Sequence, residues 1–447
     1  MQRTLLYKIL IILGLAILIA VALAMIQTTI SDRAQFRQDA VKSVSAESVR
    51  EQTITGPVLV IPYTDDYDEV IPAGSKQEAA ETVHRSVARK HLVFPNQLDI
   101  DGNLETYRRY RGIHQVLMYS GAHSIKGDFT LPAASALPRA SGRSVVTVGR
   151  AYLTLGIEDV RGIADFPKVN WNGGVVEFQQ GSGMQPARGG LHADLPATNL
   201  DTKASFAFQL KLNGIERQHF VPVGKNNTIT LTSNWPHPQF GGDFLPAPSR
   251  TVDAKGFHAT WTIASLATNA QQQLRDNALA TESAQLRPVD SFNVAFIEPV
   301  NVYSMAERAT KYGLLFVTLT FAAFFMFEIL KQLPIHPVQY LLVGLALVLF
   351  FLLLVSLSEH IAFMFAYLAA SSACIVLIGY YLSAVLGDWR RGMGFGVGLT
   401  LLYGALYGLL VSENNALVLG SLLLFAVLAA VMVATRKVDW YQIGKAA

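Results

Sequence analysis

The sequence contains 10 histidines, which could bind a transition metal, but they are scattered. No His-x-x-x-His pair and no His-Glu-x-x-His helix occurs, so a zinc metalloprotease would lack its ligands. The single cysteine, Cys374, can form neither an intramolecular disulfide nor a CxxC redox pair. Gly-x-Ser-x-Gly and Walker phosphate-binding motifs are missing as well. We therefore expect no enzyme, no resident metal and no cofactor.

Four acidic residues near the start of the polar region could offer oxygen ligands to Ca²⁺. They are Asp65, Asp66, Asp68 and Glu69, and their spacing fits no EF-hand loop. We interpret them as a solvated acidic loop. The polar stretch 67–90 that they enter is interpreted as a variable loop and receives no role.

Two other groups are candidates for a partner or ligand surface. Trp235 and His237 lie in a WPHP segment whose prolines fix the backbone, so they could be presented to a partner together with Phe240. Alternatively, Trp235 and Phe240 fill the core and the prolines end a strand. Asp159 and Arg161 are predicted to point to one face at the end of a strand, either as a structural ion pair at a turn or as part of a site.

The composition indicates a membrane protein. Charged residues are 15% of the 447-residue chain, whereas a soluble domain carries roughly 25%. The net charge of +3 is too even for a nucleic-acid-binding surface. Six apolar stretches reach the length of about 20 residues that a spanning helix needs. They are 5–26, 312–330, 338–357, 361–386, 393–411 and 416–434.

The basic residues of the short loops predict the orientation of these spans. The loops at 358–360 and 412–415 carry no Lys or Arg, whereas Lys and Arg gather on the opposite side. Both termini are therefore expected in the cytoplasm, with the large domain outside. The first span could instead be a cleaved signal peptide, but its apolar run of 22 residues exceeds the usual 7 to 15. We expect it to be retained.

The region between the first and second spans predicts a β-rich domain. Helical spacing of Ile30, Ala34, Val41 and Val44 indicates a short amphipathic stalk. From Thr53 onward, β-rich runs alternate with Gly, Pro, Asn and Asp, which favours an antiparallel β-sandwich or two of them. The expected domains are an anchor (1–30), a β-rich periplasmic domain (31–311), a five-helix bundle (312–434) and a cytoplasmic tail (435–447).

Within the predicted spans the only charged residues are Lys8 and Glu328. Charged residues at the membrane midplane usually mark ion pathways. Because Lys8 and Glu328 lie near the ends of their spans, ion-coupled transport is disfavoured. We expect a helical ion pair between Glu328 and Lys331 at the interface, or a role beside the 334–337 loop. Small residues at four-residue spacing allow close helix packing, in the bundle or in an oligomer. The glycines concerned are Gly392, Gly396, Gly404 and Gly408.

Several segments across nearly the whole chain resemble the CreD family of bacterial inner-membrane proteins. The most distinctive are LTSNWPHPQFGGDFLP at 231–246 and GFHATW at 256–261. Further matching segments are QTITGPVLVIPY at 52–63, DVRGI at 159–163, EPVNVY at 298–303, RATKY at 308–312, LTFAAFFMFE at 319–328 and HPVQYLLVGL at 336–345.

The resemblance implies a protein that supports cell envelope integrity, is controlled by a two-component system and has no settled biochemical activity. Together with the missing catalytic motifs, it leads us to expect a non-enzymatic protein. It implies no catalytic residues. The partners expected are membrane lipids and other envelope proteins. An alternative is a transporter or lipid-handling protein, in which Phe321, Phe324, Phe325, Phe327, Tyr403 and Tyr407 could line an apolar path. In the first of these hypotheses, residues 308–311 form a rigid join between domain and bundle. A weaker alternative is a regulatory partner of an envelope signalling kinase.

The predicted topology can be tested with reporter fusions. Alkaline phosphatase fused within 358–360 or 412–415 should be active, because these loops are expected outside the cytoplasm. The matched control is a fusion at 331–337, which should be inactive. Cytoplasmic signals at the first two positions would contradict the topology.

Overall fold

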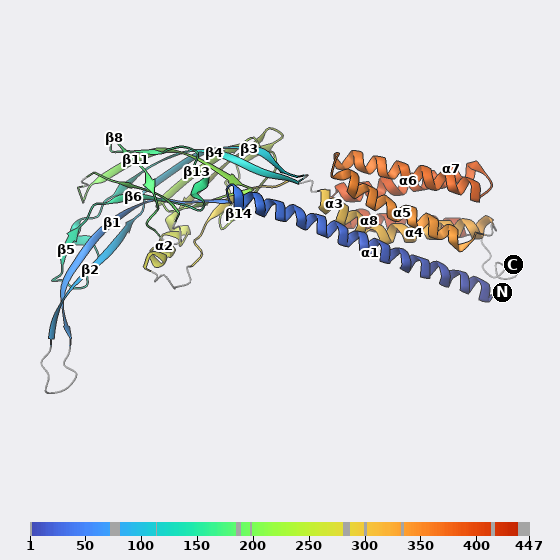
Figure 1. Cartoon of the computed structure of the whole chain (residues 1–447), viewed down its shortest axis with the longest axis horizontal. Helices are drawn as coiled ribbons and strands as arrows, with labels where there is room; N and C mark the ends of the chain where they lie inside the picture. The colour runs from blue at the N-terminus through green and yellow to red at the C-terminus, as the bar shows by residue number, and fades with distance from the viewer. Residues whose placement is uncertain are drawn as a thin grey trace, which may run out of the picture. The chain divides into compact units, whose positions relative to one another are not determined.

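The computed structural model describes residues 2–71, 81–112, 114–184, 189–196, 199–279, 287–298, 302–331, 335–412 and 416–436. The chain divides into two compact units. One comprises residues 1–38 and 300–447, and the other comprises residues 39–299. The first is helical and the second is β-rich (Figure 1). The domain boundaries drawn from the sequence stay predictions.

The helices occupy all the positions predicted from apolar runs. They are α1 (Gln2–Glu47), α2 (Ala270–Leu279), α3 (Val302–Lys311), α4 (Gly313–Lys331), α5 (Pro337–Ser358), α6 (Phe363–Val385), α7 (Trp389–Val411) and α8 (Ala416–Thr435). The first span and the predicted stalk form the single helix α1.

The β-rich unit carries the strands. They are β1 (Gln52–Ile71), β2 (Glu81–Val93), β3 (Gln97–Arg111), β4 (His114–Thr130), β5 (Val145–Val148), β6 (Tyr152–Ile157), β7 (Lys168–Trp171), β8 (Gly174–Glu177), β9 (Gln179–Gln180), β10 (Gly190–Asp194), β11 (Lys203–Ile215), β12 (Arg217–Val221), β13 (Asn226–Ser233), β14 (Pro238–Gly242), β15 (Thr251–Asp253), β16 (Gly256–Ala264) and β17 (Phe292–Phe296).

These strands form two sheets. The 9-stranded sheet has the order β14-β17-β12-β1-β6-β10-β9, with β2 and β5 also paired to β1. The 8-stranded sheet has the order β15-β16-β13-β3-β4-β11-β7-β8. The sequence suggested antiparallel sheets, but both sheets are mixed. Strand β1 pairs with β12 in parallel, and β3 pairs with β13 in parallel. Each of these pairs joins strands that are distant in the chain, so local patterning carries no sign of it.

One hydrophobic core serves both sheets. Alternate residues of β11 and β13 are buried, as expected for strands with one face on a core. Across the core, Trp261 of β16 stacks on Phe292 of β17 with ring centroids 4.7 Å apart. Helix α2 adds Ala270 and Leu274 to the same cluster. The large β-rich region predicted from the sequence is therefore confirmed, and both sheets depend on one apolar interior.

The predicted acidic loop is a strand. Asp65 to Glu69 lie within β1, which pairs with β2 from Leu59↔Val93 to Ile71↔Glu81. Facing residues contact each other across this hairpin. Glu69 forms an ion pair with Arg85 at 2.9 Å, and Asp68 Oδ1 lies 3.0 Å from His84 Nδ1. The alternation of acid on one strand and base on the other stabilises the pairing. Residues 72–80 of the predicted variable loop lie outside the described residues.

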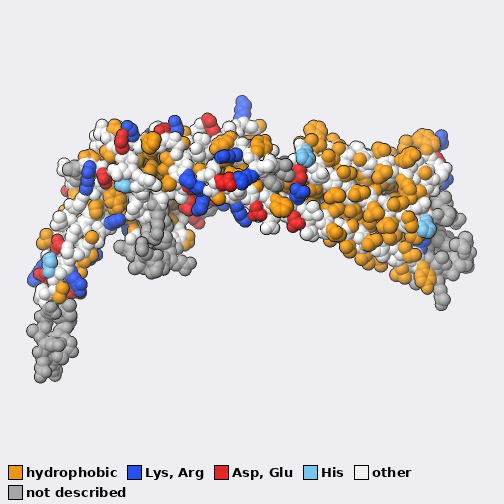
Figure 2. All heavy atoms as spheres, viewed as in Figure 1, with side chains coloured by type: hydrophobic (Ala, Val, Ile, Leu, Met, Phe, Trp, Pro, Cys, Tyr) orange, Lys and Arg blue, Asp and Glu red, His pale blue; other side chains and the backbone are white. Residues whose placement is uncertain are grey.

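The helical unit contains long apolar helices. By length and composition, α1, α5, α6 and α7 can each cross a membrane, and α3 with α4 counts as a fifth, bent span with a 41° angle. Helix α8 is apolar over the shorter segment Val418–Val433. Hydrophobic side chains cover the visible surface of this unit, whereas charged groups are spread over the β-rich unit (Figure 2).

Helix α1 packs into the helical bundle. Ile19 and Leu23 are buried there, and Ile19 lies so close to Gly344 of α5 that a Cβ on this glycine would come within 2.9 Å of it. Lys8 pairs with Glu328 of α4, and the Tyr340 hydroxyl donates to the same carboxylate at 2.8 Å. The expected partner of Glu328 was Lys331, whose side chain lies outside the described residues. Sequence spacing gave no sign of Lys8, which tertiary packing brings to the carboxylate from 320 positions earlier in the chain. The Glu328–Lys331 pair stays a prediction.

The four glycines expected to pack in the bundle differ in their surroundings. A Cβ on Gly392 would come within 2.7 Å of the Ser383 backbone on α6, so α6 and α7 approach closely there. Gly396 is 4.0 Å from Ile375 by the same measure. At Gly404 and Gly408 a Cβ would meet nothing within 4 Å in the described part of the chain. Of these four glycines, Gly392 marks the close contact between helices in the part of the chain that the structure describes.

A buried polar pair joins the two sheets. His123 of β4 and Gln218 of β12 are both fully buried, and the Gln218 amide donates to His123 Nε2 at 2.9 Å. Gly102 and Gly121 leave room for the ring, since a Cβ on either would lie 2.7 Å from a ring nitrogen. Burial lowers the pKa of His123 from 6.5 to about 4, because the charged form is poorly solvated there. The imidazole is therefore neutral in the folded protein.

This burial predicts a pH dependence of stability. Below pH 6.5 the unfolded state binds a proton at His123 that the folded state does not bind until about pH 4. The free energy of unfolding should fall across that interval by up to about 3 kcal/mol. His123→Leu should remove this part of the pH dependence. Urea unfolding of the two proteins in detergent between pH 4 and 8 measures the difference, and parallel pH profiles would contradict the prediction.

Candidate functional site

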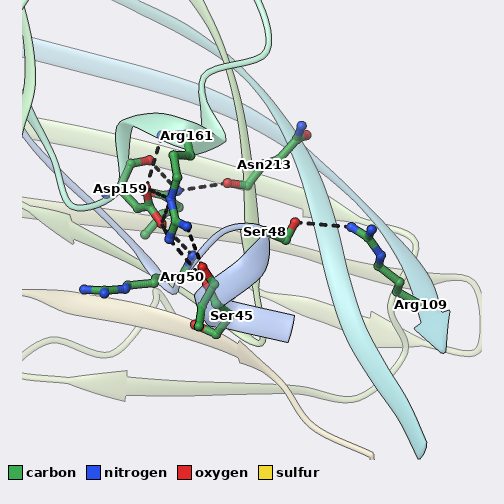
Figure 3. Close-up of polar contacts among 9 residues, drawn as sticks. Ser45, Ser48, Arg50, Arg109, Asp159, Arg161 and Asn213 are labelled. Atoms are coloured by element: carbon green, nitrogen blue, oxygen red, sulfur yellow. Dashed lines mark hydrogen bonds and ion pairs between the residues drawn. The ribbon is translucent and has the colours of Figure 1, made fainter. Parts of the chain in front are cut away.

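The end of α1 contains the densest polar cluster among the predicted site residues. The last carbonyl groups of a helix have no partner within the helix, and here a side chain from the β-rich unit supplies donors. Arg161 Nη1 donates to the Ala46 carbonyl at 2.7 Å, and its Nη2 donates to the Ser45 carbonyl at 3.3 Å (Figure 3). A cation at a helix C-terminus also interacts favourably with the helix dipole. Arg161 therefore caps α1.

Asp159 holds this arginine in place. Arg161 Nε donates to Asp159 Oδ1 at 2.9 Å and Nη2 to Oδ2 at 2.6 Å, which is a two-point contact. The backbone amide of Arg50 also donates to Oδ2, at 3.1 Å. The Arg161 guanidinium lowers the pKa of the Asp159 carboxyl below its usual 3.8, so the aspartate is ionised at neutral pH. The carboxylate thus binds both the arginine and the segment that follows α1.

Buried amide groups fix the turn that carries this pair. Gln52 Nε2 donates to the carbonyls of Asp159 and Asn213, each at 3.0 Å, and the Asp159 amide donates to Gln52 Oε1 at 3.2 Å. Gly162 makes this possible, because a Cβ there would lie 2.3 Å from both Asn213 O and Gln52 Nε2. The sequence DVRGI therefore builds a turn that only glycine at its fourth position allows.

Apolar contacts and further ion pairs surround the cap. Val44 and Val49 are buried with three residues of neighbouring strands in one small cluster, whose strand members are Val116, Met118 and Ile215. Arg109 of β3 donates to Ser48 Oγ at 3.3 Å, and Arg111 pairs with Glu47. The last turn of α1 is thus fixed to the sheet by polar contacts on its rim and by apolar packing beneath.

The sequence predicted the Asp159–Arg161 pair but not its purpose. Two residues at i and i+2 around a turn indicated an ion pair, and the structure contains it. The α1 carbonyls that complete the arrangement lie more than 110 positions earlier in the chain, and backbone acceptors leave no trace in a residue pattern. Gln52, Arg109 and Arg111 were missed as well. Of these three residues, Gln52 alone has a sequence signal, because it is the first residue of the segment 52–63 that resembles the CreD family.

The second candidate surface is largely packed inward. Trp235 lies half-buried against the core, and its indole Nε1 donates to the carbonyls of His237 and Ile297 at 3.1 and 3.0 Å. Phe240 of β14 contacts Phe257 and Trp261 edge-on. Only His237 is exposed. This geometry favours the interpretation in which the segment closes the core, and it does not bring Trp235 or Phe240 near Asp159 and Arg161 in one cluster.

The hydrogen bonds and ion pairs of the α1 cap have a structural role. Its donors and acceptors are bound to one another, which leaves no nucleophile beside a base. Among the residues that the structure describes, no group of three or more His, Cys, Asp or Glu could hold a metal ion. The arrangement fixes a helix end to a sheet.

Comparison with known proteins places the chain. The family described as "Inner membrane protein CreD" matches residues 4–441. The chain belongs to the CreD family. The inner membrane protein CreD of Escherichia coli (strain K12) is 35% identical over 444 residues, which are 99% of this chain and 95% of that protein. As a CreD protein, the chain is an inner membrane protein, which agrees with its long apolar helices.

Two solved structures of one enzyme show weak similarity to the chain. Native leukotriene A4 hydrolase from Saccharomyces cerevisiae is 10% identical, with a TM-score of 0.22, and the match covers 47% of this chain and 30% of that one. A second structure of the native yeast enzyme gives a TM-score of 0.21 with 51% and 35% covered. Neither carries an argument about the CreD protein.

The α1 cap predicts a measurable loss of stability. Asp159→Ala removes the acceptor that orients Arg161 and leaves the half-buried donors of Arg161 and Arg50 without it, so unfolding of the β-rich unit should cost about 2 kcal/mol less. Amide hydrogen exchange at 44–50 should become faster, because the helix end is no longer capped. The control is Asp165→Ala, since Asp165 is an exposed neighbour whose ion pair with Lys211 is at 3.5 Å. Equal effects of the two substitutions would contradict this role.

Proposed function

We propose that this CreD protein supports cell envelope integrity as a non-enzymatic membrane protein whose β-rich unit acts in the periplasm. In this proposal six helices cross the inner membrane and both termini lie in the cytoplasm. The β-rich unit, which resembles a sandwich, contacts envelope components or other envelope proteins.

The observation that carries the proposal is the construction of α1. Its 46 residues form one helix, which at about 1.5 Å per residue is about 69 Å long, more than twice the roughly 30 Å of a bilayer core. The apolar part is built into the helical unit through Lys8, Ile19 and Leu23. The polar end is capped by Arg161 in the β-rich unit. Within each unit the helix is held by packing, ion pairs and capping, which suits a structural role rather than turnover of a substrate.

Two ion pairs near the ends of the apolar part of α1 support the proposal that this helix crosses the membrane. At the other end of the helical unit, Glu359 after α5 accepts a hydrogen bond from the Tyr303 hydroxyl at 3.2 Å, and Arg33 of α1 lies 3.9 Å from the same carboxylate. Together with the Lys8–Glu328 pair, two ion pairs bind α1 near opposite ends of its apolar part. Charges placed at both borders of an apolar segment suit the two interfaces of a membrane.

The proposal is tested by photocrosslinking in living cells. A photoreactive residue at Val175 or Val252, both exposed on edge strands of the β-rich unit, should give adducts with periplasmic or outer-envelope molecules. The control position is Tyr380, which is exposed on α6 and should label lipid or membrane protein. Adducts of Val175 or Val252 with cytoplasmic proteins would overturn the proposal. So would full tolerance of envelope-active agents in cells that lack the protein.

A further inference from the structure

The helical unit contains an apolar groove with two arginines at one end. It has a volume of about 580 Å³ and lies between α4, α7 and α8. The groove is lined by small residues, Ala323, Gly394 and Gly398, and by Leu319, Leu402 and Val427. These are not the aromatic residues considered from the sequence, because Phe321, Phe324 and Tyr403 are buried in the bundle core.

Glycine is what opens this groove. A Cβ on Gly394 or Gly398 would meet nothing within 4 Å, so both positions adjoin empty space along one face of α7. The polar side chain in the wall, Thr320, already donates its hydroxyl to the Phe316 carbonyl at 2.9 Å. The groove beyond its mouth therefore offers an occupant only apolar contact.

The mouth carries a net positive charge. Arg390 and Arg391 both line it, and they lie on the first turn of α7, where the helix dipole also favours an anion. Asp388 is 3.6 Å from Arg391 and offsets one of the two charges. Arg390 is exposed, and no side-chain partner for it is found among the described residues. One positive charge is thus left for a ligand.

The dimensions of the groove match one leaflet of a bilayer. From Arg391 to Leu402 the helix rises about 16 Å at about 1.5 Å per residue, and half of the hydrocarbon core is about 15 Å. Trp389 is 63% exposed beside the arginines, and exposed tryptophan is typical of the headgroup level. The arginines therefore meet a phosphate at the height where a lipid carries it.

We propose that this groove binds an anionic phospholipid, with one acyl chain along Gly394 and Gly398 and the phosphate between Arg390 and Arg391. A net charge of +1 at the mouth complements a lipid with a single negative charge, such as phosphatidylglycerol, better than a zwitterionic one. The inference does not rest on the role of the β-rich unit, so its failure would leave the proposed function intact.

Native mass spectrometry of the full-length protein tests the inference. The protein is titrated with phosphatidylglycerol, phosphatidylcholine or inorganic phosphate. Phosphatidylglycerol should bind most tightly, and the double variant Arg390→Gln, Arg391→Gln should weaken it about tenfold. The matched control Arg436→Gln removes a charge from the exposed end of α8 and should bind as the wild type does. Equal binding of both lipids, or displacement by inorganic phosphate, would overturn the inference.

Filling the groove separates chain binding from headgroup binding. Gly394→Leu with Gly398→Leu should abolish retention of phosphatidylglycerol, whereas Gly404→Leu, on the same helix and also beside open space, should not. Unchanged retention in the double variant would overturn the inference.

A measurement on the wild-type protein does not depend on the folding of any variant. Photoactivatable phosphatidylglycerol in vesicles should label peptides of α7 and α4, and labelling confined to other helices would equally overturn it.

Discussion

A helix must satisfy the carbonyl groups of its last turn, and in this protein that requirement determines how α1 ends. Arg161 supplies the donors to Ser45 and Ala46, Asp159 orients Arg161, and Gln52 fixes the turn that carries both. Each contact presupposes the next, and all of them presuppose Gly162, whose missing Cβ lets the turn lie against Asn213. The β-rich unit thus includes the last turn of α1, and residues of the same unit supply the hydrogen-bond donors for the carbonyls of that turn.

The same helix meets the opposite demand at its other end. Inside an apolar bundle a single charge is costly, and removing one partner of a buried pair is more costly than lacking the pair. Lys8 and Glu328 form an ion pair, and the Tyr340 hydroxyl donates a hydrogen bond to the other carboxylate oxygen of Glu328. The two ends of α1 are therefore fixed by different means. One uses charge neutralisation among apolar side chains, and the other uses a capping cation at a half-exposed surface.

The sequence predicted what local patterns determine. Apolar runs identified every long helix, because a span is read from about 20 consecutive residues. The β-rich runs predicted from Thr53 onward are strands, and alternate residues of strands such as β11 and β16 are buried. The parallel pairings of β1 and β3, the Lys8–Glu328 pair and the acceptors of Arg161 all join residues far apart in the chain. Charged residues at 65–69 suggested a loop, but their partners on β2 make them a strand. The pairing of opposite charges on β1 and β2 can be recognised only once the register of the two strands is known.

The packing of Ile19 against Gly344 has a consequence for maturation of the chain. A leader peptide is expendable, since the mature fold is complete without it. Here Ile19 and Leu23 fill space between α4 and α5 that Gly313 and Gly344 leave open, and Lys8 neutralises a carboxylate within the bundle. Processing by a signal peptidase after Ala24 would leave an empty seam and an uncompensated negative charge in the membrane. We therefore expect the first segment to be retained as part of the bundle.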